Sequence, residues 1–150
     1  MKYLVLCVVL SYAYAASVDT SKAILQKQFD VFRKCMVVGN VTESEVEVIF
    51  KKGEVPEGRK IKCLLGCFMK GMGYLTDDGK IDWSIMDDIN RKEYVNPDEV
   101  KRALEISALC SKSVPQNLGN LCDAGYAGTK CFLDEAVKRK LTLHGPKDAE

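Results

Sequence analysis

The chain has 150 residues, of which 47% are hydrophobic and 8% aromatic, and its 22 Lys and Arg nearly balance its 21 Asp and Glu. This length suits a single domain with a mainly aliphatic core. Because the net charge is only +1, the composition gives no support for a nucleic-acid or anionic-lipid partner.

The N-terminal segment predicts a secretory leader. Lys2 supplies a positive charge, residues 3–10 are apolar, and Ala13 and Ala15 are small residues where a signal peptidase cleaves. The apolar run is shorter than the ~20 residues of a membrane-spanning helix. We therefore predict a signal peptide at residues 1–15 and one domain at 16–150; an uncleaved anchor or a buried N-terminal helix is the alternative.

The rest of the chain predicts an all-α domain of six helices, since no segment alternates apolar and polar residues over a strand length. The first helix is expected from residue 19 or 20 to 38 and ends at Gly39 and Asn40. The second begins at Thr42, where Thr42 and Glu45 form a capping box, and continues through Phe50.

The remaining four helices are expected at 59–72, 82–91, 97–110 and 120–139. Asp82 is a plausible cap of the fourth helix, while Asn96 and Pro97 begin the fifth. In the sixth, Gly125 and Gly128 each cost about 1 kcal/mol relative to Ala. Either a neighbouring backbone approaches closely there, or the helix depends on its disulfides. From about Leu141 the tail is expected to be irregular, with Gly145 followed by Pro146.

The cysteines predict a disulfide framework. Cys7 lies in the leader, and the remaining six are an even set behind an export signal, separated by 27, 3, 42, 11 and 8 residues: Cys35, Cys63, Cys67, Cys110, Cys122 and Cys131. Six cysteines allow fifteen pairings. Cys63 and Cys67 lie four apart on a helix with parallel Cβ directions, so they are not expected to pair with each other. Twelve pairings remain, and each ties the third helix to two other segments.

Three bridges can also hold helices around an interior that is not fully packed. Each bridge contributes about 2–4 kcal/mol, whereas a cavity costs stability in proportion to its volume. The framework is therefore compatible with a pocket.

The cysteine spacing is accompanied by the segment CLLGCFMKGMG at 63–73, the Asp78-Gly79 turn and Cys131-Phe132. In these features the chain resembles the insect odorant-binding proteins of the six-cysteine type. The resemblance covers essentially the whole mature chain. It implies six helices around a buried apolar cavity and the bridges Cys35–Cys67, Cys63–Cys122 and Cys110–Cys131. Residues 123–130 have fewer large apolar side chains than is usual in the family, which suggests a roomier or more mobile wall.

Ten residues are candidates for lining the cavity, because an apolar pocket with few polar groups suits a small hydrophobic ligand and Met adapts to its shape. They are Leu65, Met69, Met72, Tyr74, Ile85, Met86, Ile89, Leu104, Ala108 and Phe132. Ordinary core packing is the alternative for each. The hydroxyls of Tyr74 and Tyr126 could contact a polar atom of the ligand.

Two further residues have candidate roles. His144, the sole histidine, is interpreted as a solvated tail residue; a pH-sensitive lid, with Leu141 and Leu143 folded over the cavity, is the alternative. Asn40-Val41-Thr42 is a glycosylation sequon.

No enzyme, metal or cofactor site is predicted. The sequence has no G-x-S-x-G, and a tail histidine is a poorly positioned base. The cysteines are expected to form disulfides, so they are not available as a nucleophile or as zinc ligands. The turn at 76–79 is not a calcium loop, because Tyr74 and Ile85 occupy positions where calcium ligands would be needed.

The sequence therefore predicts a secreted, extracellular carrier that transports small hydrophobic ligands such as odorants or pheromones, without nucleic acid or stable membrane insertion. We expect a monomer or weak homodimer that could contact a receptor. The alternative is a salivary, venom or other non-olfactory protein on the same scaffold that scavenges a mediator or acts through its surface. A filled interior would favour the alternative.

Overall fold

The computed structural model describes residues 2–145 and 148, with side chains from residue 14 onward. In these residues six helices follow one another and confirm the all-α class: α1 (Lys2–Gly39), α2 (Glu43–Lys52), α3 (Arg59–Met72), α4 (Trp83–Glu93), α5 (Pro97–Ser113) and α6 (Leu121–Lys138). An isolated antiparallel bridge between Leu75 and Ile81 closes the turn between α3 and α4. Within the described part of the chain, no helix combines the length and the apolarity that crossing a bilayer requires.

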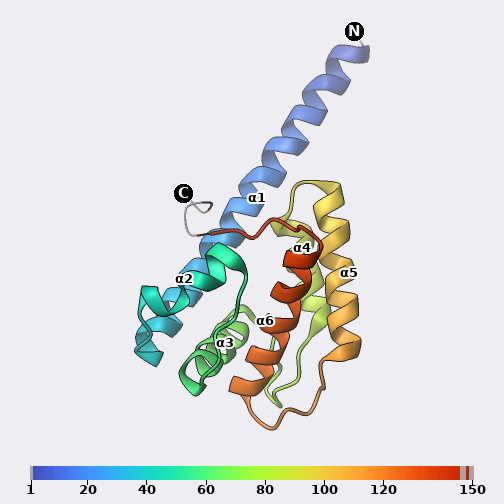
Figure 1. Cartoon of the computed structure of the whole chain (residues 1–150). Helices are drawn as coiled ribbons and strands as arrows, with labels where there is room; N and C mark the ends of the chain where they lie inside the picture. The colour runs from blue at the N-terminus through green and yellow to red at the C-terminus, as the bar shows by residue number, and fades with distance from the viewer. Residues whose placement is uncertain (1, 146–147, 149–150) are drawn as a thin grey trace.

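Helix α1 is much longer than predicted. It begins at Lys2 rather than near residue 19 and extends beyond the bundle (Figure 1). Residues 2–20 contain no Gly or Pro, so nothing in the sequence interrupts the helix between the predicted leader and the domain. From residue 14 to 20 no side chain is buried, and the first buried one is Ser21. The packed part of α1 therefore begins close to the predicted helix start.

Helices α3 and α6 pack with their backbones almost in contact. A Cβ added to Gly125 would lie 2.4 Å from the Cα of Gly66, and one added to Gly66 would lie 2.4 Å from the Leu121 carbonyl oxygen. We call this contact between α3 and α6, at Gly66 and Gly125, the seam. Glycine is needed on both of its sides because no side chain fits between the helices. Close approach of the α3 backbone therefore explains Gly125, whereas a Cβ on Gly128 would meet the side chains of Ile81 and Met69. The expected roomier wall is wrong for this face.

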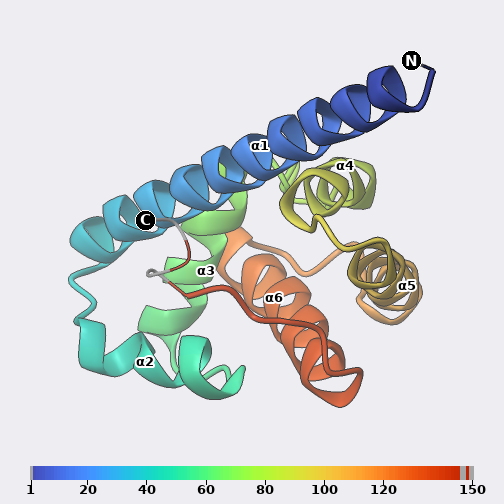
Figure 2. The ribbon, with the colours of Figure 1, turned by 90° about the horizontal axis from the view of Figure 1, so that it is seen from above.

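Three disulfides connect the helices in the pairing that the resemblance implied. Cys35–Cys67 joins α1 to α3, Cys63–Cys122 joins α3 to α6, and Cys110–Cys131 joins α5 to α6. Helix α3 is thus tied to two other helices, and it lies between α1 and α6 when the molecule is seen from above (Figure 2).

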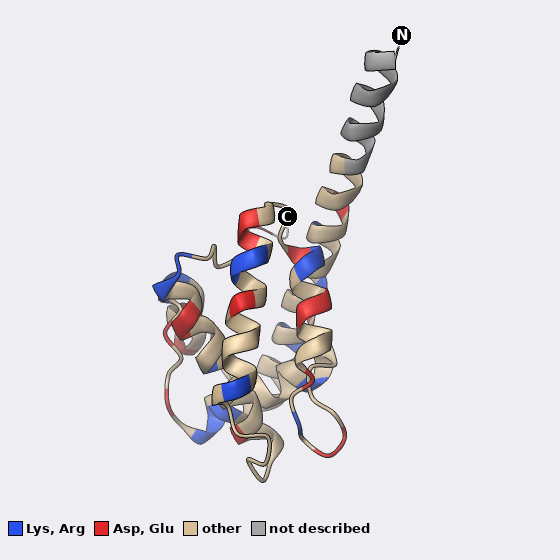
Figure 3. Cartoon of the chain, turned by 90° about the vertical axis from the view of Figure 1, so that its right-hand side faces the viewer, with Lys and Arg blue, Asp and Glu red and all other residues tan. Residues whose placement is uncertain are grey.

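Several helix ends follow the sequence signals. The Glu45 carboxylate accepts a hydrogen bond from the Thr42 N–H at 2.7 Å in the predicted capping box. Asp82 accepts from the N–H of Ser84 at 3.0 Å, and Asn96 caps α5 with Pro97 at its first position. Lys and Arg positions are interspersed with Asp and Glu positions along the helices (Figure 3).

Candidate functional site

A pocket of about 160 Å³ lies among α1, α2, α3, α4, α6 and the segment after α6. A cavity of about 150 Å³ in an apolar core can hold benzene, so this pocket has room for a one-ring molecule. Its lining consists of Gln28, Phe29, Phe32, Ile49, Phe50, Leu65, Phe68, Met69, Tyr74, Met86, Asn90, Glu93, Tyr94, Thr129, Phe132, Leu133, Leu143 and His144.

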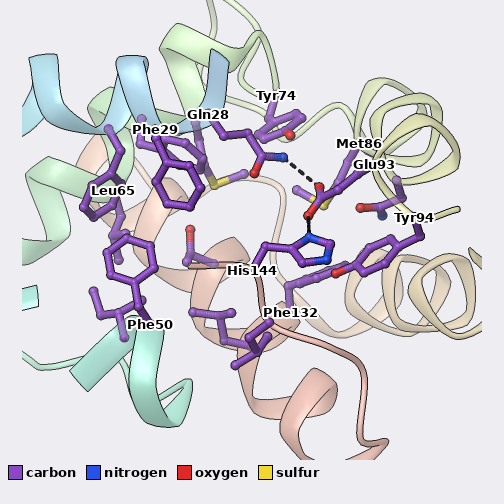
Figure 4. Close-up of a pocket in the computed structure, with 18 residues that line it drawn as sticks. Gln28, Phe29, Phe50, Leu65, Tyr74, Met86, Glu93, Tyr94, Phe132 and His144 are labelled. Atoms are coloured by element: carbon purple, nitrogen blue, oxygen red, sulfur yellow. Dashed lines mark hydrogen bonds and ion pairs between the residues drawn. The ribbon is translucent and has the colours of Figure 1, made fainter. Parts of the chain in front are cut away.

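One end of the pocket is aromatic. The Phe32 ring of α1 meets Phe50 of α2 edge to face, with centroids 5.2 Å apart, and meets Phe68 of α3 at 5.6 Å. Phe29, one turn before Phe32, lies 5.7 Å from Phe50. Because edge-to-face rings attract each other beyond their burial, these side chains form an ordered apolar wall. Leu65 lies beside this wall (Figure 4).

The opposite end is polar and is centred on Glu93, the last residue of α4. Its Oε2 accepts a hydrogen bond from Nε2 of Gln28 at 2.7 Å, and its Oε1 lies 2.9 Å from Nδ1 of His144 (Figure 4). The exposed fractions of the Glu93 and His144 side chains are 11% and 18%, so the pair is largely removed from water. The backbone carbonyl of Glu93 also accepts a hydrogen bond from the Ser21 hydroxyl, which ties α4 to α1.

The Glu93 carboxylate changes the pKa values of neighbouring side chains. Its hydrogen bond to His144 raises the pKa of that imidazole, against the opposing effect of burial. Burial, and then the Glu93 carboxylate, raises the pKa of Tyr74 above its ordinary value, so Tyr74 keeps its proton at neutral pH. The polar end therefore presents a carboxylate, an imidazole, a phenol and an amide to the pocket.

The segment after α6 closes one side of the pocket. Figures 1 and 2 show it running back across the bundle from α6. Leu141 is 4% exposed, and the Tyr94 hydroxyl donates to the Thr142 carbonyl at 3.1 Å. Leu143 and His144 then line the pocket, with the His144 ring 5.2 Å from that of Tyr94.

This placement corrects the interpretation of His144 as a solvated tail residue. Its ring is held by Glu93 and Tyr94, so the segment is packed, although residues 141–145 have no regular secondary structure, as expected. Pro146 of the predicted tail lies outside the described residues. The alternation of Leu141 and Leu143 was the signal for a packed segment.

Five of the ten candidate residues lie in the lining: Leu65, Met69, Tyr74, Met86 and Phe132. The structure places the others outside it. Met72 and Ile89 are buried in the core, Ile85 is 38% exposed, Leu104 is half-buried and Ala108 is exposed.

Helix α5 explains two of these differences, because it contributes none of the lining residues. Its buried face consists of Ala103, Ile106, Ser107 and Cys110, which is a different face from that of Leu104 and Ala108. Tyr126 also lies outside the lining, where Lys62 Nζ sits 5.0 Å from its ring centroid.

The aromatic rings that α1 and α2 contribute to the pocket, and its polar end, were not predicted from the sequence. Phe29 and Phe32 have the three-residue spacing of one apolar helix face, but the same spacing is equally typical of ordinary core. Glu93 and Gln28 had no sequence signal, because a single charged residue near a helix end is usually exposed. Among the described residues, no three His, Cys, Asp or Glu side chains gather as a metal site would require.

Six helices, three bridges and a pocket between the helices define a disulfide-stapled helical ligand-binding domain. The model of the PBP/GOBP family matches residues 17–135. The chain therefore belongs to this family of insect odorant-binding proteins. Proteins of this family are carriers of hydrophobic ligands rather than enzymes, and this chain is a carrier in that general sense.

Individual relatives agree with this assignment. The chain is 32% identical over 141 residues to general odorant-binding protein 28a of Drosophila melanogaster, covering 92% of this chain and 94% of the relative. The solved structure of odorant-binding protein dmelOBP28a from Drosophila melanogaster has a TM-score of 0.64 and 31% identity, covering 81% of this chain and 98% of that chain. Apis mellifera odorant binding protein 5, at a TM-score of 0.61 and 21% identity over 78% of this chain and 89% of that chain, supports the fold alone.

Proposed function

We propose that this protein binds small, mainly apolar molecules of odorant or pheromone type in the pocket between α1, α2, α3, α4 and α6 and transports them through extracellular fluid. The observation that carries the proposal is the hollow of about 160 Å³ beside the aromatic wall of Phe29, Phe32, Phe50 and Phe68. A protein acting only through its surface has no need of such a hollow, which supports the carrier role over the surface-acting alternative.

Desolvation is the proposed driving force. Apolar surface that leaves water contributes about 25 cal/mol per Å², so a ligand is held in proportion to the apolar area that it buries. Met69 and Met86 have flexible side chains that can follow different ligand outlines. These features favour a carrier that accepts a group of related molecules.

The test is displacement of an apolar fluorescent probe from the purified, oxidised protein by one-ring ligands of increasing size. We expect micromolar displacement, and we expect affinity to fall once the ligand is too large for the hollow. Failure of every ligand and of the probe itself to bind would contradict the proposal.

Secretion with removal of residues 1–15 is a second part of the proposal. The family model begins at residue 17, no side chain from 14 to 20 is buried, and disulfides form in oxidising compartments. N-terminal sequencing of the protein secreted by insect cells should give Ala16 as the first residue. A secreted chain that still carries residues 1–15 would contradict this part.

We also propose an N-linked glycan on Asn40. This residue is exposed in the turn between α1 and α2, with φ of 48°, and Thr42 completes the sequon. Treatment of the secreted protein with an N-glycosidase should lower its mass, and Asn40→Gln should abolish that change. An unchanged mass in the wild-type protein would contradict the assignment.

A further inference from the structure

The two ends of the pocket differ in chemistry, and this difference bears on which ligands fit. We propose that Gln28, Glu93 and His144 make the pocket select one-ring ligands whose head group donates a hydrogen bond, alcohols and phenols above all, and reject carboxylates. This inference rests on the proposed carrier function and names the ligand class for the same pocket.

Glu93 can accept a further hydrogen bond. An ionised carboxylate has about four lone-pair sites and no donor. Gln28 and His144 each occupy one side of the carboxylate, at 2.7 and 2.9 Å. Acceptor capacity therefore remains on a side chain that is only 11% exposed, where water is scarce. A ligand group with an O–H or N–H can use this capacity, whereas a hydrocarbon leaves it unused.

Donors are present at the same end. Tyr74 keeps its phenolic O–H, and the Gln28 amide has a second N–H besides the one given to Glu93. A ligand hydroxyl can donate to Glu93 and accept from one of these groups at the same time. A ketone or an ester can only accept, so it satisfies half of the polar end, and unpaired buried polar groups are costly.

A carboxylate ligand meets the wrong charge. Glu93 and His144, together with the phenols of Tyr74 and Tyr94, are the titratable groups of the lining, which contains no Lys or Arg. His144 is already paired with Glu93, so a ligand carboxylate would lie beside Glu93 without a free cation to balance it. Like charges placed together in an interface strongly disfavour binding. An ammonium head group has a larger desolvation cost than a hydroxyl on entering the pocket, and this cost offsets part of its attraction to Glu93.

The size and shape of the rest of the pocket determine which apolar part of a ligand can fit. The hollow of about 160 Å³ has room for one ring, and the rings of Phe29 and Phe50 lie at the end opposite the polar cluster (Figure 4). An aromatic or cyclic body with a short chain would therefore place its hydroxyl beside Glu93 when its ring reaches the aromatic wall.

Four ligands that share one ring and a two-carbon chain test the inference: 2-phenylethanol, phenylacetate, 2-phenylethylamine and ethylbenzene. Their affinities for the oxidised protein are measured at pH 7 by probe displacement. We expect 2-phenylethanol to bind at least about tenfold more tightly than phenylacetate, and more tightly than the other two. This ratio tests the selection in the wild-type protein, whatever the stability of any variant.

The Glu93→Gln variant tests whether Glu93 causes the preference for alcohols over carboxylates. It removes the charge and keeps the size, so the alcohol-to-carboxylate ratio should fall to about threefold or less. Asp88→Asn is the matched control, because Asp88 is exposed on the same helix and lies outside the lining. This control should leave the ratio unchanged, and circular dichroism checks the fold of both variants.

The outcomes separate the two proposals. Phenylacetate binding as tightly as 2-phenylethanol overturns the selection while leaving the carrier function intact. A ratio that Glu93→Gln does not change, in a folded variant, overturns the role of Glu93. Absence of binding by the probe and all four ligands overturns the carrier function, and the selection with it.

Discussion

The seam between α3 and α6 and the pocket that both helices also line are built in opposite ways. At the seam, Gly66 and Gly125 let two backbones touch, and no space remains. At the pocket, five phenylalanines lie around a hollow. The smallest side chains thus lie where packing is tightest, and the largest lie around the empty volume. Space between helices depends on how far apart the backbones are held, and side-chain size alone does not reveal it.

Helix α3 contributes to both regions through different faces. Gly66 faces α6, while Leu65, Phe68 and Met69 reach the pocket. Cys63–Cys122 fastens the seam, and Cys35–Cys67 holds α1 against the same helix. The seam is therefore expected to be the rigid part of the molecule, against which the pocket can adapt.

Gly125→Ala should have the largest effect, because its Cβ would lie 2.4 Å from the Gly66 Cα and force two backbones apart. Although Ala favours a helix by about 1 kcal/mol over Gly, we expect a net loss of at least about 3 kcal/mol in the free energy of unfolding. Denaturant unfolding of the oxidised protein measures it.

Gly71→Ala is the matched control for the seam. This glycine is also helical, but it is exposed, and its Cβ would meet only the side chain of Val31, at 2.6 Å. The side chain can move, so stability should stay within about 1 kcal/mol of the wild type. Equal losses in the two variants would show that the seam is no tighter than other glycine positions.

Thr129→Phe should affect the pocket instead of the seam. Thr129 lines the hollow from α6, so a phenyl ring there occupies the ligand volume, and we expect affinity for a one-ring ligand to fall at least about tenfold. Ala108→Phe is the control, since the structure places Ala108 on the exposed side of α5. Probe displacement compares the two, and a loss of affinity in Ala108→Phe alone would move the site towards α5.

The sequence predicted the covalent frame much better than the pocket. Cysteine spacing and helix signals such as Asn96-Pro97 are local, and they survive folding unchanged. The position of the pocket depends on how far each helix is rotated about its axis. Leu104 and Ala108 share a plausible apolar face with their neighbours, yet α5 buries Ala103 and Ile106 instead. Glu93 and Gln28 lie 65 residues apart, so only the folded chain brings them together.

Leu143→Ala should loosen the segment that covers the pocket and leave the seam intact. Leu143 lines the hollow, and losing most of its side chain should cost the docked segment about 1 kcal/mol. Hydrogen exchange should become faster at residues 142–145, with unchanged protection at Gly66 and Gly125. Faster exchange at the seam as well would show that the two regions open together.

The smallest expected effect is a dependence of this segment on pH. His144 has its pKa raised from 6.5, first by the hydrogen bond to Glu93 and then by the charges of Glu93, Asp148 and Glu99, against desolvation. A group whose pKa is raised by folding stabilises the folded arrangement fully below its unfolded value. That stabilisation is lost as the pH rises through the folded pKa. Docking of residues 142–145 should therefore weaken from pH 6 to pH 8.

NMR titration of the His144 ring and protection factors at residues 142–145 measure this dependence. The pKa should lie above 6.5 in the wild type and return towards it in Glu93→Gln, where the charged partner is gone. Asp88→Asn, on the exposed side of α4, should leave the titration unchanged. A wild-type pKa at or below 6.5, or stronger protection at pH 8 than at pH 6, would mean that the Glu93–His144 contact does not hold the segment. The aromatic end and Leu143 would then have to hold it without help from charge.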